Sequence, residues 1–191
     1  MISEDKLIVD CKKGNSIAQD VLYNQYASSM LGVCLRYCKN KAEAEDVLQE
    51  GFIKIFTSIN KFEPQHTGSL SSWIKRIIVN TAINYLRERA KCNFVDIETV
   101  NQGIFIDENE TEELNYRNLP FSQAEIMEMI QNLPDGYQIV FNLYVFEKYT
   151  HKEIAEVLKI SESTSKTQLL KARTLLKKNL IEAKKKLLIA I

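Results

Sequence analysis

Residues 150–180 carry a two-helix pattern, and this pattern restricts the possible folds of the chain more than any other feature. Thr150 and Glu153 are spaced as a capping box, in which the hydroxyl accepts from a first-turn amide and the carboxylate reaches back. The short helix that follows is apolar at Ile154, Ala155, Val157 and Leu158. After a short break, either Ser161 or Ser163 can cap a second helix.

The second helix of the pattern has an apolar stripe and a polar face. The stripe comprises Leu169, Ala172, Leu176 and Leu180, at spacings of three and four. The opposite face comprises Thr164, Thr167, Lys171 and Lys178, with Lys166 and Gln168 on its flanks. Two short helices, the second offering donors and cations outward, suit insertion into the major groove of DNA. The pattern predicts a DNA-binding helix-turn-helix; the alternative is an αα-hairpin with a solvated lysine face.

The composition of the 191-residue chain favours an all-α fold. Only three Pro and six Gly residues interrupt it, and no apolar run is long enough to span a membrane. The first residues show no signal-peptide pattern, so we expect a cytoplasmic protein without direct membrane insertion. Cys11, Cys34, Cys38 and Cys92 form no paired metal-binding motif and are expected to be buried thiols.

The charges balance, with 25 bases and 25 acids, but they are segregated along the chain. Residues 159–186 contain nine Lys or Arg against two acids, whereas residues 93–116 contain seven acids and no base. A local basic surface binds phosphate whatever the total charge is. Nucleic-acid binding is therefore compatible with a net charge of zero.

A helix predicted over residues 42–59 presents an acidic face that contains one aliphatic residue. Its outward residues are Asp46, Gln49, Glu50, Ile53 and Thr57. An exposed aliphatic in such a patch suits protein docking, although single exposed aliphatics are also common on ordinary surfaces. A carboxylate metal site is the weaker alternative, because the chain has only two histidines and lacks Glu-x-x-His motifs. We expect no metal and no cofactor.

The helix predicted over residues 70–91 follows a polar loop and is cationic, with five bases against Glu88. Arg76, Asn80 and Arg87 lie on its outer side, with Trp73 at the border and Lys75 nearby. An aromatic beside cations and an amide suits single-stranded nucleic acid, whose bases stack and whose phosphates pair with cations. The alternative is that Trp73 belongs to the core.

The chain is predicted to form two helical domains joined by an acidic linker. The first domain covers residues 1–91, the linker residues 92–121 and the second domain residues 122–191. The linker lacks helical periodicity. The second domain opens on another capping box, Ser122 with Glu125. The apolar C-terminal residues could pack on the domain or on a partner.

Three separated runs, in this order, resemble the extracytoplasmic-function (ECF) sigma factors of bacterial RNA polymerase. They are AEAEDVLQEGFIKIF, LSSWIKRIIVNTAINYLRER and LPDGYQIVFNLYVFEKYTHKEIAEVLKISESTSKTQLLKARTLL. ECF factors retain only the second and fourth conserved sigma regions. The resemblance therefore implies an all-α protein with a region 2 bundle and a region 4 helix-turn-helix, and no catalytic residues.

The resemblance also implies roles for the two surfaces of the first domain. The core polymerase-binding residues would be Asp46, Gln49, Glu50 and Ile53. The residues for the melted downstream (−10) element would be His66, Trp73, Lys75, Arg76, Asn80, Asn84 and Arg87. Asn80 is the best-matched of these, and Asn84 stands where the family often has Asp.

In the second domain, the resemblance places readers of the upstream (−35) element on the second helix of the helix-turn-helix. They would be Thr164, Lys166, Thr167, Gln168, Leu170 and Lys171. Ser165 stands where the family usually has Val on the buried side, which is expected to loosen packing. Gln168 stands where a base is common, which is expected to weaken phosphate affinity or change specificity.

The function that the resemblance implies is that of an initiation factor which binds core polymerase and opens promoter DNA. Its partners would be core RNA polymerase, promoter DNA as duplex and single strand, and an anti-sigma factor. A helix-turn-helix repressor that acts without polymerase is the rival from another class, and a helical metalloenzyme is a third possibility. Two tethered weak readers fit the first hypothesis best, because effective concentration multiplies their affinity.

Overall fold

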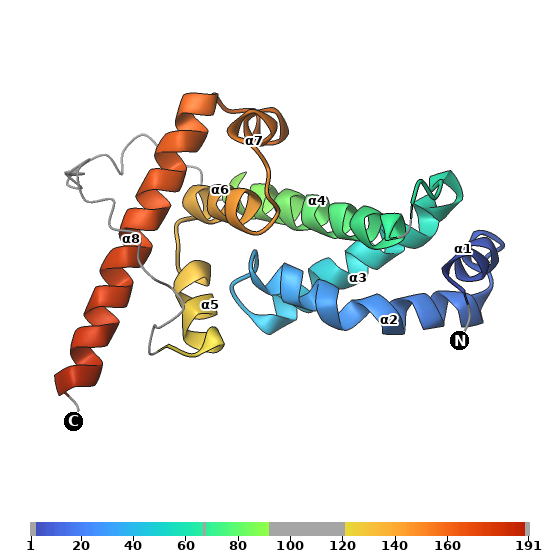
Figure 1. Ribbon diagram of the computed structural model, residues 1–191, viewed down its shortest axis with the longest axis horizontal. Coiled ribbons are helices and arrows are strands. Elements are labelled where there is room, and N and C mark those ends of the chain that lie inside the picture. Colours follow the sequence, from blue (N-terminus) through green and yellow to red (C-terminus); the bar gives the residue numbers. More distant parts are fainter. Residues whose placement is uncertain (1–2, 67, 92–120, 190–191) are drawn as a thin grey trace. The chain divides into compact units, whose positions relative to one another are not determined.

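The structure is a computed structural model that describes residues 3–66, 68–91 and 121–189. The described residues contain helices and turns but no strand, so the all-α prediction is confirmed. The chain divides into two compact units, Met1–Arg89 and Ala90–Ile191 (Figure 1). The predicted acidic linker, residues 92–121, lies almost wholly outside the described residues.

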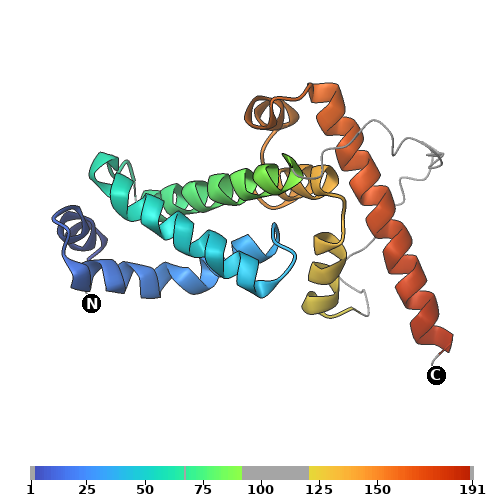
Figure 2. The ribbon, with the colours of Figure 1, turned by 180° about the vertical axis from the view of Figure 1, so that it is seen from behind.

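The N-terminal unit is a helical bundle. It comprises α1 (Glu4–Lys12), α2 (Ser16–Leu35), α3 (Lys41–Ser58), the short 3-10 helix η1 (Ile59–Lys61) and α4 (Ser69–Lys91). Helix α3 lies between α2 and α4, as both ribbon views show (Figures 1 and 2). Gly51 allows α3 to approach α4 closely, because a Cβ at this position would clash with the side chain of Ile78.

Asparagine side chains cap two helices of this unit. Asn15 Oδ1 accepts from Ile17 N at 2.9 Å and thereby starts α2, directly after Gly14 with φ of 74°. Asn40 Oδ1 accepts from Glu43 N at 2.9 Å and starts α3. These asparagines fix where the core-facing stripes of α2 and α3 begin.

Aliphatic side chains from every helix meet in the core of the N-terminal unit. Its largest fully buried members are Leu22, Tyr37, Ile55, Ile59, Leu70, Ile74, Ile78, Ile83 and Leu86. Helical periodicity predicts an inward stripe on α4 made of Leu70, Ile74, Ile77, Ile78, Thr81 and Tyr85. In the structure Val79, Ala82, Ile83 and Leu86 are buried as well, while Ile77 and Tyr85 are half-buried.

Cys11, Cys34 and Cys38 are buried thiols in this core, as predicted, and Cys92 lies outside the described residues. Burial raises the pKa of the Cys34 thiol to about 12. This thiol is therefore protonated at neutral pH and a poor nucleophile.

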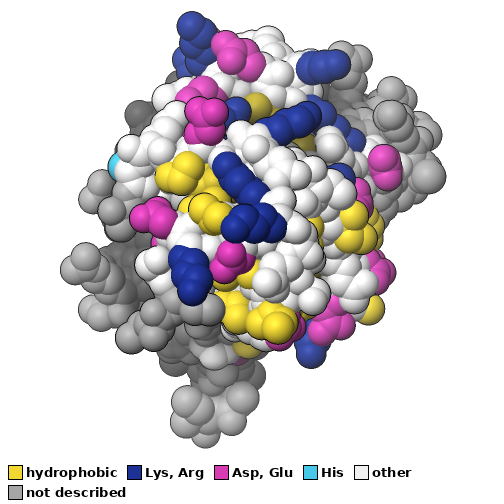
Figure 3. Space-filling model, turned by 90° about the vertical axis from the view of Figure 1, so that its right-hand side faces the viewer, with side chains coloured by type: hydrophobic (Ala, Val, Ile, Leu, Met, Phe, Trp, Pro, Cys, Tyr) yellow, Lys and Arg dark blue, Asp and Glu magenta, His cyan; other side chains and the backbone are white. Residues whose placement is uncertain are grey.

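The end of the N-terminal unit that carries α1 exposes apolar side chains among charges of both signs (Figure 3). Val9 on α1 and Ile17 near the start of α2 are exposed there. Ile17 is the most exposed of the large hydrophobic residues described, at 73%. Single exposed aliphatics are normal on protein surfaces.

The C-terminal unit comprises α5 (Gln123–Gln131), α6 (Asp135–Val145), α7 (His151–Leu158) and α8 (Glu162–Ile189). Helix α8 is the longest and packs on α5, α6 and α7. The core of this unit gathers buried residues from all four helices, including Ile130, Leu133, Tyr137, Val140, Leu143, Ile154, Leu169 and Ala172. Both predicted capping boxes are present, with Ser122 at α5 and Thr150 at α7.

Candidate functional site

Helices α7 and α8 form the predicted helix-turn-helix. The Thr150 hydroxyl accepts from Glu153 N at 3.3 Å, and the Glu153 carboxylate accepts from Thr150 N at 2.8 Å. Helix α7 ends at Lys159, whose φ of 56° is left-handed. Ser161 Oγ accepts from Thr164 N at 3.0 Å, so Ser161 rather than Ser163 caps α8.

The exposed face near the start of α8 carries most of the predicted upstream-element readers. Lys166, Thr167 and Leu170 are exposed, and Leu170 keeps 43% of its surface accessible. Thr164 and Lys171 are half-buried at the edge of this face. The face therefore offers cations, a hydroxyl and one aliphatic group, the mixture that contacts phosphates and base edges.

Gln168 does not lie on that face. It is only 7% exposed, and its amide packs over Gly136 of α6, where a Cβ would lie 3.4 Å from Gln168 Nε2. The prediction that Gln168 contacts DNA is incompatible with this placement. The stripe that faces α6 and α7 is wider than expected and includes Ser165 and Gln168 beside Leu169 and Ala172.

Ser165 has a specific partner, which the sequence did not indicate. Its side chain is fully buried, and its hydroxyl lies 2.9 Å from Nδ1 of His151 at the start of α7. The His151 ring stacks on Tyr144 of α6 with centroids 4.7 Å apart, and the Arg173 guanidinium lies over the same tyrosine at 5.7 Å. The small residue at Ser165 therefore does not leave a loose contact, because this cluster joins α6, α7 and α8.

The His151 cluster makes the stability of the C-terminal unit dependent on pH. Burial, followed by the charges of Lys166 and Arg173, lowers the pKa of His151, while Glu162 acts in the opposite direction. A lowered pKa means that the unfolded chain binds more protons, so stability is lost as pH falls below about 6.5, the ordinary histidine value, toward the lower pKa of the folded state. We expect the melting temperature of this unit to fall as the pH is lowered below about 6.5, and to fall less in His151→Gln than in the wild-type protein. An equal fall in wild type and variant, followed by circular dichroism, would contradict this role.

The predicted single-strand-binding residues of the N-terminal unit are spread along α4 and the preceding loop. Asn80, Asn84, Arg76 and His66 are exposed, which leaves them accessible to a ligand. Lys75, Arg87 and Trp73 are half-buried. Helical periodicity places Trp73, Arg76, Asn80, Asn84 and Arg87 on one side of α4, and Lys75 lies away from that side.

Trp73 packs partly against the loop instead of standing alone on the helix. Its ring lies 4.9 Å, centroid to centroid, from buried Phe62. The ammonium of Lys12 donates to the carbonyl oxygen of Phe62 at 2.6 Å and so fastens this loop to α1. Part of Trp73 remains exposed and can still stack on a base.

All four predicted polymerase-binding residues are exposed on α3. Ile53 is the most prominent, at 63% exposure, and Asp46, Gln49 and Glu50 surround it with acidic and amide groups. A groove of about 300 Å³ between α2 and α3 borders this surface. The groove is lined by Tyr23, Ala27, Ser28, Leu31, Glu45, Leu48 and Gln49. The predicted docking surface thus borders a hollow whose lining is both polar and apolar.

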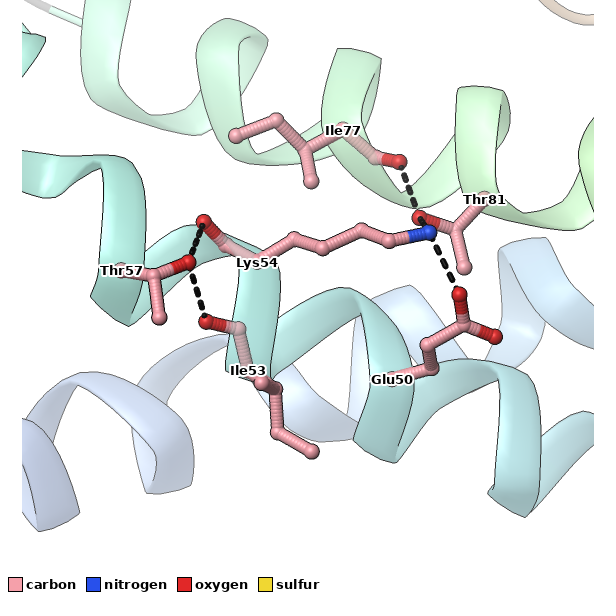
Figure 4. A network of polar contacts seen from close by, with 6 residues as sticks. All are labelled: Glu50, Ile53, Lys54, Thr57, Ile77 and Thr81. Carbon is pink, nitrogen blue, oxygen red and sulfur yellow. Dashed lines mark hydrogen bonds and ion pairs between the residues drawn. The ribbon is translucent and has the colours of Figure 1, made fainter.

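Lys54 links the docking surface to α4 (Figure 4). Its ammonium contacts Glu50 Oε1 at 2.5 Å and Thr81 Oγ1 at 3.4 Å. The Thr81 hydroxyl itself donates to the carbonyl oxygen of Ile77 at 2.9 Å. Lys54 therefore bridges Glu50 on α3 and Thr81 on α4, the helix that also carries Asn80.

Within the ranges that the structure describes, no group of three or more His, Cys, Asp or Glu residues could hold a metal ion. In the same ranges, no helix is long and apolar enough to cross a bilayer.

Comparisons with known proteins match both units. The family model described as Sigma-70 region 2 matches residues 22–92, and the model described as Sigma-70, region 4 matches residues 123–176. The ECF RNA polymerase sigma factor SigW of Bacillus subtilis is 29% identical over 92% of this chain and 95% of its own. The RNA polymerase sigma-H factor of Pseudomonas aeruginosa is 26% identical over 93% of both chains.

A solved structure has the same fold at low identity. The sigma factor RpoE from Bartonella quintana, in complex with the anti-sigma factor NepR, is 16% identical. It superposes with a TM-score of 0.52 and covers 85% of this chain and 96% of its own.

Proposed function

Because the chain belongs to the ECF sigma factors of bacterial RNA polymerase, we propose that its two units divide promoter recognition between them. The protein acts in promoter recognition and in the initiation of transcription with RNA polymerase. In this proposal the N-terminal unit binds core polymerase and the melted strand, and the C-terminal unit binds the upstream duplex. The observation that carries the division is that the docking surface on α3 and the helix-turn-helix belong to separate compact units.

For the upstream element, the proposed readers are Lys166, Thr167, Leu170 and Lys171, with Thr164 on a phosphate. Exposed cations and a hydroxyl support the phosphate and base-edge contacts, and exposed Leu170 suits the methyl group of a thymine. The proposed set leaves out Gln168, because its side chain is buried.

For the downstream element, the proposed contacts come from α4 and the loop before it. Asn80 and Asn84 can hydrogen-bond an unpaired base, and Arg76 can pair with a phosphate. Strand opening then needs no catalytic group, because preferential binding to the unpaired state shifts the equilibrium. The factor is proposed to be non-enzymatic and cytoplasmic, and to be held by an anti-sigma factor until it is needed.

A run-off transcription assay with core polymerase tests the proposal. We expect a promoter-dependent transcript only when the protein and core polymerase are both present. The rival is a repressor that binds DNA without polymerase. Tight operator binding by the protein alone, with no transcript in any reconstituted reaction, would favour the repressor.

Asn80→Ala is expected to impair promoter opening and to leave polymerase binding intact. The side chain is exposed, so its loss removes a contact to the melted strand without a packing defect. Permanganate footprinting of unpaired thymines measures opening, and gel filtration with core polymerase measures binding. If Asn80→Ala lost polymerase binding instead, the assignment of this face to DNA would be wrong.

A further inference from the structure

The helix-turn-helix contains two lysines in a backbone conformation that lysine disfavours. Lys148, before α7, has φ of 62°, and Lys159, after it, has φ of 56°. Over the described ranges these are the two non-glycine residues with positive φ. Glycine adopts this conformation without the steric penalty that a Cβ imposes, so it is the usual residue there.

Both lysines stand in helix-terminating turns where the backbone enforces the conformation. The amide of Tyr149, next to Lys148, donates to the Leu143 carbonyl at 3.0 Å and closes the end of α6. The amide of Ile160, next to Lys159, donates to the Ala155 carbonyl at 3.1 Å and closes the end of α7. Turns of this kind usually place glycine at the left-handed position.

The two turns also repeat one local sequence. Lys148-Tyr149-Thr150 precedes α7 and Lys159-Ile160-Ser161 precedes α8, so each lysine lies two residues before the hydroxyl that caps a helix. In a helix-turn-helix on DNA, the second helix enters the major groove and the first crosses the backbone. The exposed ammonium groups of Lys148 and Lys159 therefore lie near the ends of the two helices that approach the duplex.

The helix ends themselves are poor phosphate sites. The Glu153 carboxylate occupies the start of α7, where it accepts from Thr150 N, and Glu162 lies in the first turn of α8. These acids counter the positive end of each helix dipole. With Gln168 turned into the core, the exposed part of α8 that faces the groove also has fewer donors than its sequence indicates.

We propose that Lys148 and Lys159 are phosphate contacts that extend the duplex footprint of the C-terminal unit to both sides of α7. At these two positions lysine, in place of glycine, adds a cation that binds a DNA phosphate, and its strained backbone lowers the stability of the C-terminal unit. The inference rests on the proposed function, because it requires that the helix-turn-helix binds duplex DNA.

The test uses Lys148→Gly and Lys159→Gly, singly and together, in the full chain. Glycine relieves the left-handed strain, so we expect the melting temperature of the C-terminal unit to rise by roughly 2–5 °C. Binding to a fluorescent random-sequence duplex, measured across a salt series, should weaken. The slope of log K against log[salt] should become shallower by about 0.9 for each lysine removed.

Two controls test whether a change in slope comes from the loss of charge at these two positions. Lys148→Arg and Lys159→Arg keep the charge and should keep the wild-type slope. Lys41→Gln removes one charge from an exposed residue of α3 in the other unit and should change neither the slope nor the C-terminal melting temperature.

The outcomes distinguish this inference from the function on which it rests. If the wild-type protein binds the duplex and the glycine variants retain its affinity and slope, the lysine inference is overturned while the proposed function stands. If the wild-type protein and its polymerase complex show no salt-dependent duplex binding, the proposed function of the C-terminal unit fails and the inference fails with it.

Discussion

Ile53→Gln is expected to weaken binding to core polymerase at least tenfold while the N-terminal unit stays folded. Ile53 projects from α3 with 63% of its surface exposed, so its replacement leaves no cavity. Burying an isoleucine side chain in an interface is worth about 1.5–3 kcal/mol, and a glutamine placed there must also lose its hydration. Fluorescence anisotropy with labelled protein and core polymerase gives the affinity, and thermal unfolding should change by less than about 0.5 kcal/mol.

Ile17→Gln is the matched control for this experiment. Ile17 is equally apolar and even more exposed, at 73%, but it lies near the start of α2 and outside the proposed docking surface. It should bind polymerase as wild type does. Equal losses in the two variants would mean that the interface is not centred on α3, and no loss in either would exclude Ile53 from it.

Leu169→Ala and Leu170→Ala are expected to impair different properties, although the two residues are adjacent. The first variant should lose stability and the second should lose DNA sequence discrimination. Leu169 is 4% exposed and packs in the core of the C-terminal unit, so truncation should cost about 2–5 kcal/mol of stability. A loss of this size lowers the melting temperature of a small domain by more than roughly 8 °C. Leu170 is 43% exposed, and its truncation should leave stability within about 0.5 kcal/mol.

Leu170→Ala should instead change which upstream sequences the holoenzyme prefers. The expected effect is weaker discrimination for thymine at one position, since the variant loses an apolar contact with the methyl group. Competition between duplexes that differ at single positions measures this preference, and circular dichroism follows unfolding. Unchanged preference in Leu170→Ala would remove this residue from the readers, and a stability loss matching that of Leu169→Ala would contradict the placement of the two side chains.

Local signals in the sequence predicted most of the helices and their starts. The capping boxes at Thr150 and Ser122 depend on residues three positions apart, and both are present. At the start of α2 the sequence suggests Ser16 as the cap, and this prediction is wrong, because its neighbour Asn15 fills the position. Neighbouring good caps cannot be ranked by propensity alone.

Contacts between distant residues account for what the sequence did not predict. Gln168 is polar and lies at the edge of its helix stripe, and it is buried because its amide packs beside Gly136 on another helix. Ser165 pairs with His151, and Lys54 reaches Thr81 from α3 to α4. Helical periodicity contains no information about such partners, since it describes one helix at a time.

The two separate cores have a consequence for molecules in which only the C-terminal unit has unfolded. Each unit buries its own set of side chains, so we expect the two units to unfold in separate transitions that no single free energy of unfolding describes. A molecule whose helix-turn-helix has melted still displays Asp46, Gln49, Glu50 and Ile53 on an intact α3. Such a molecule would occupy core polymerase without finding the upstream element, and would act as a competitor of its own undamaged copies.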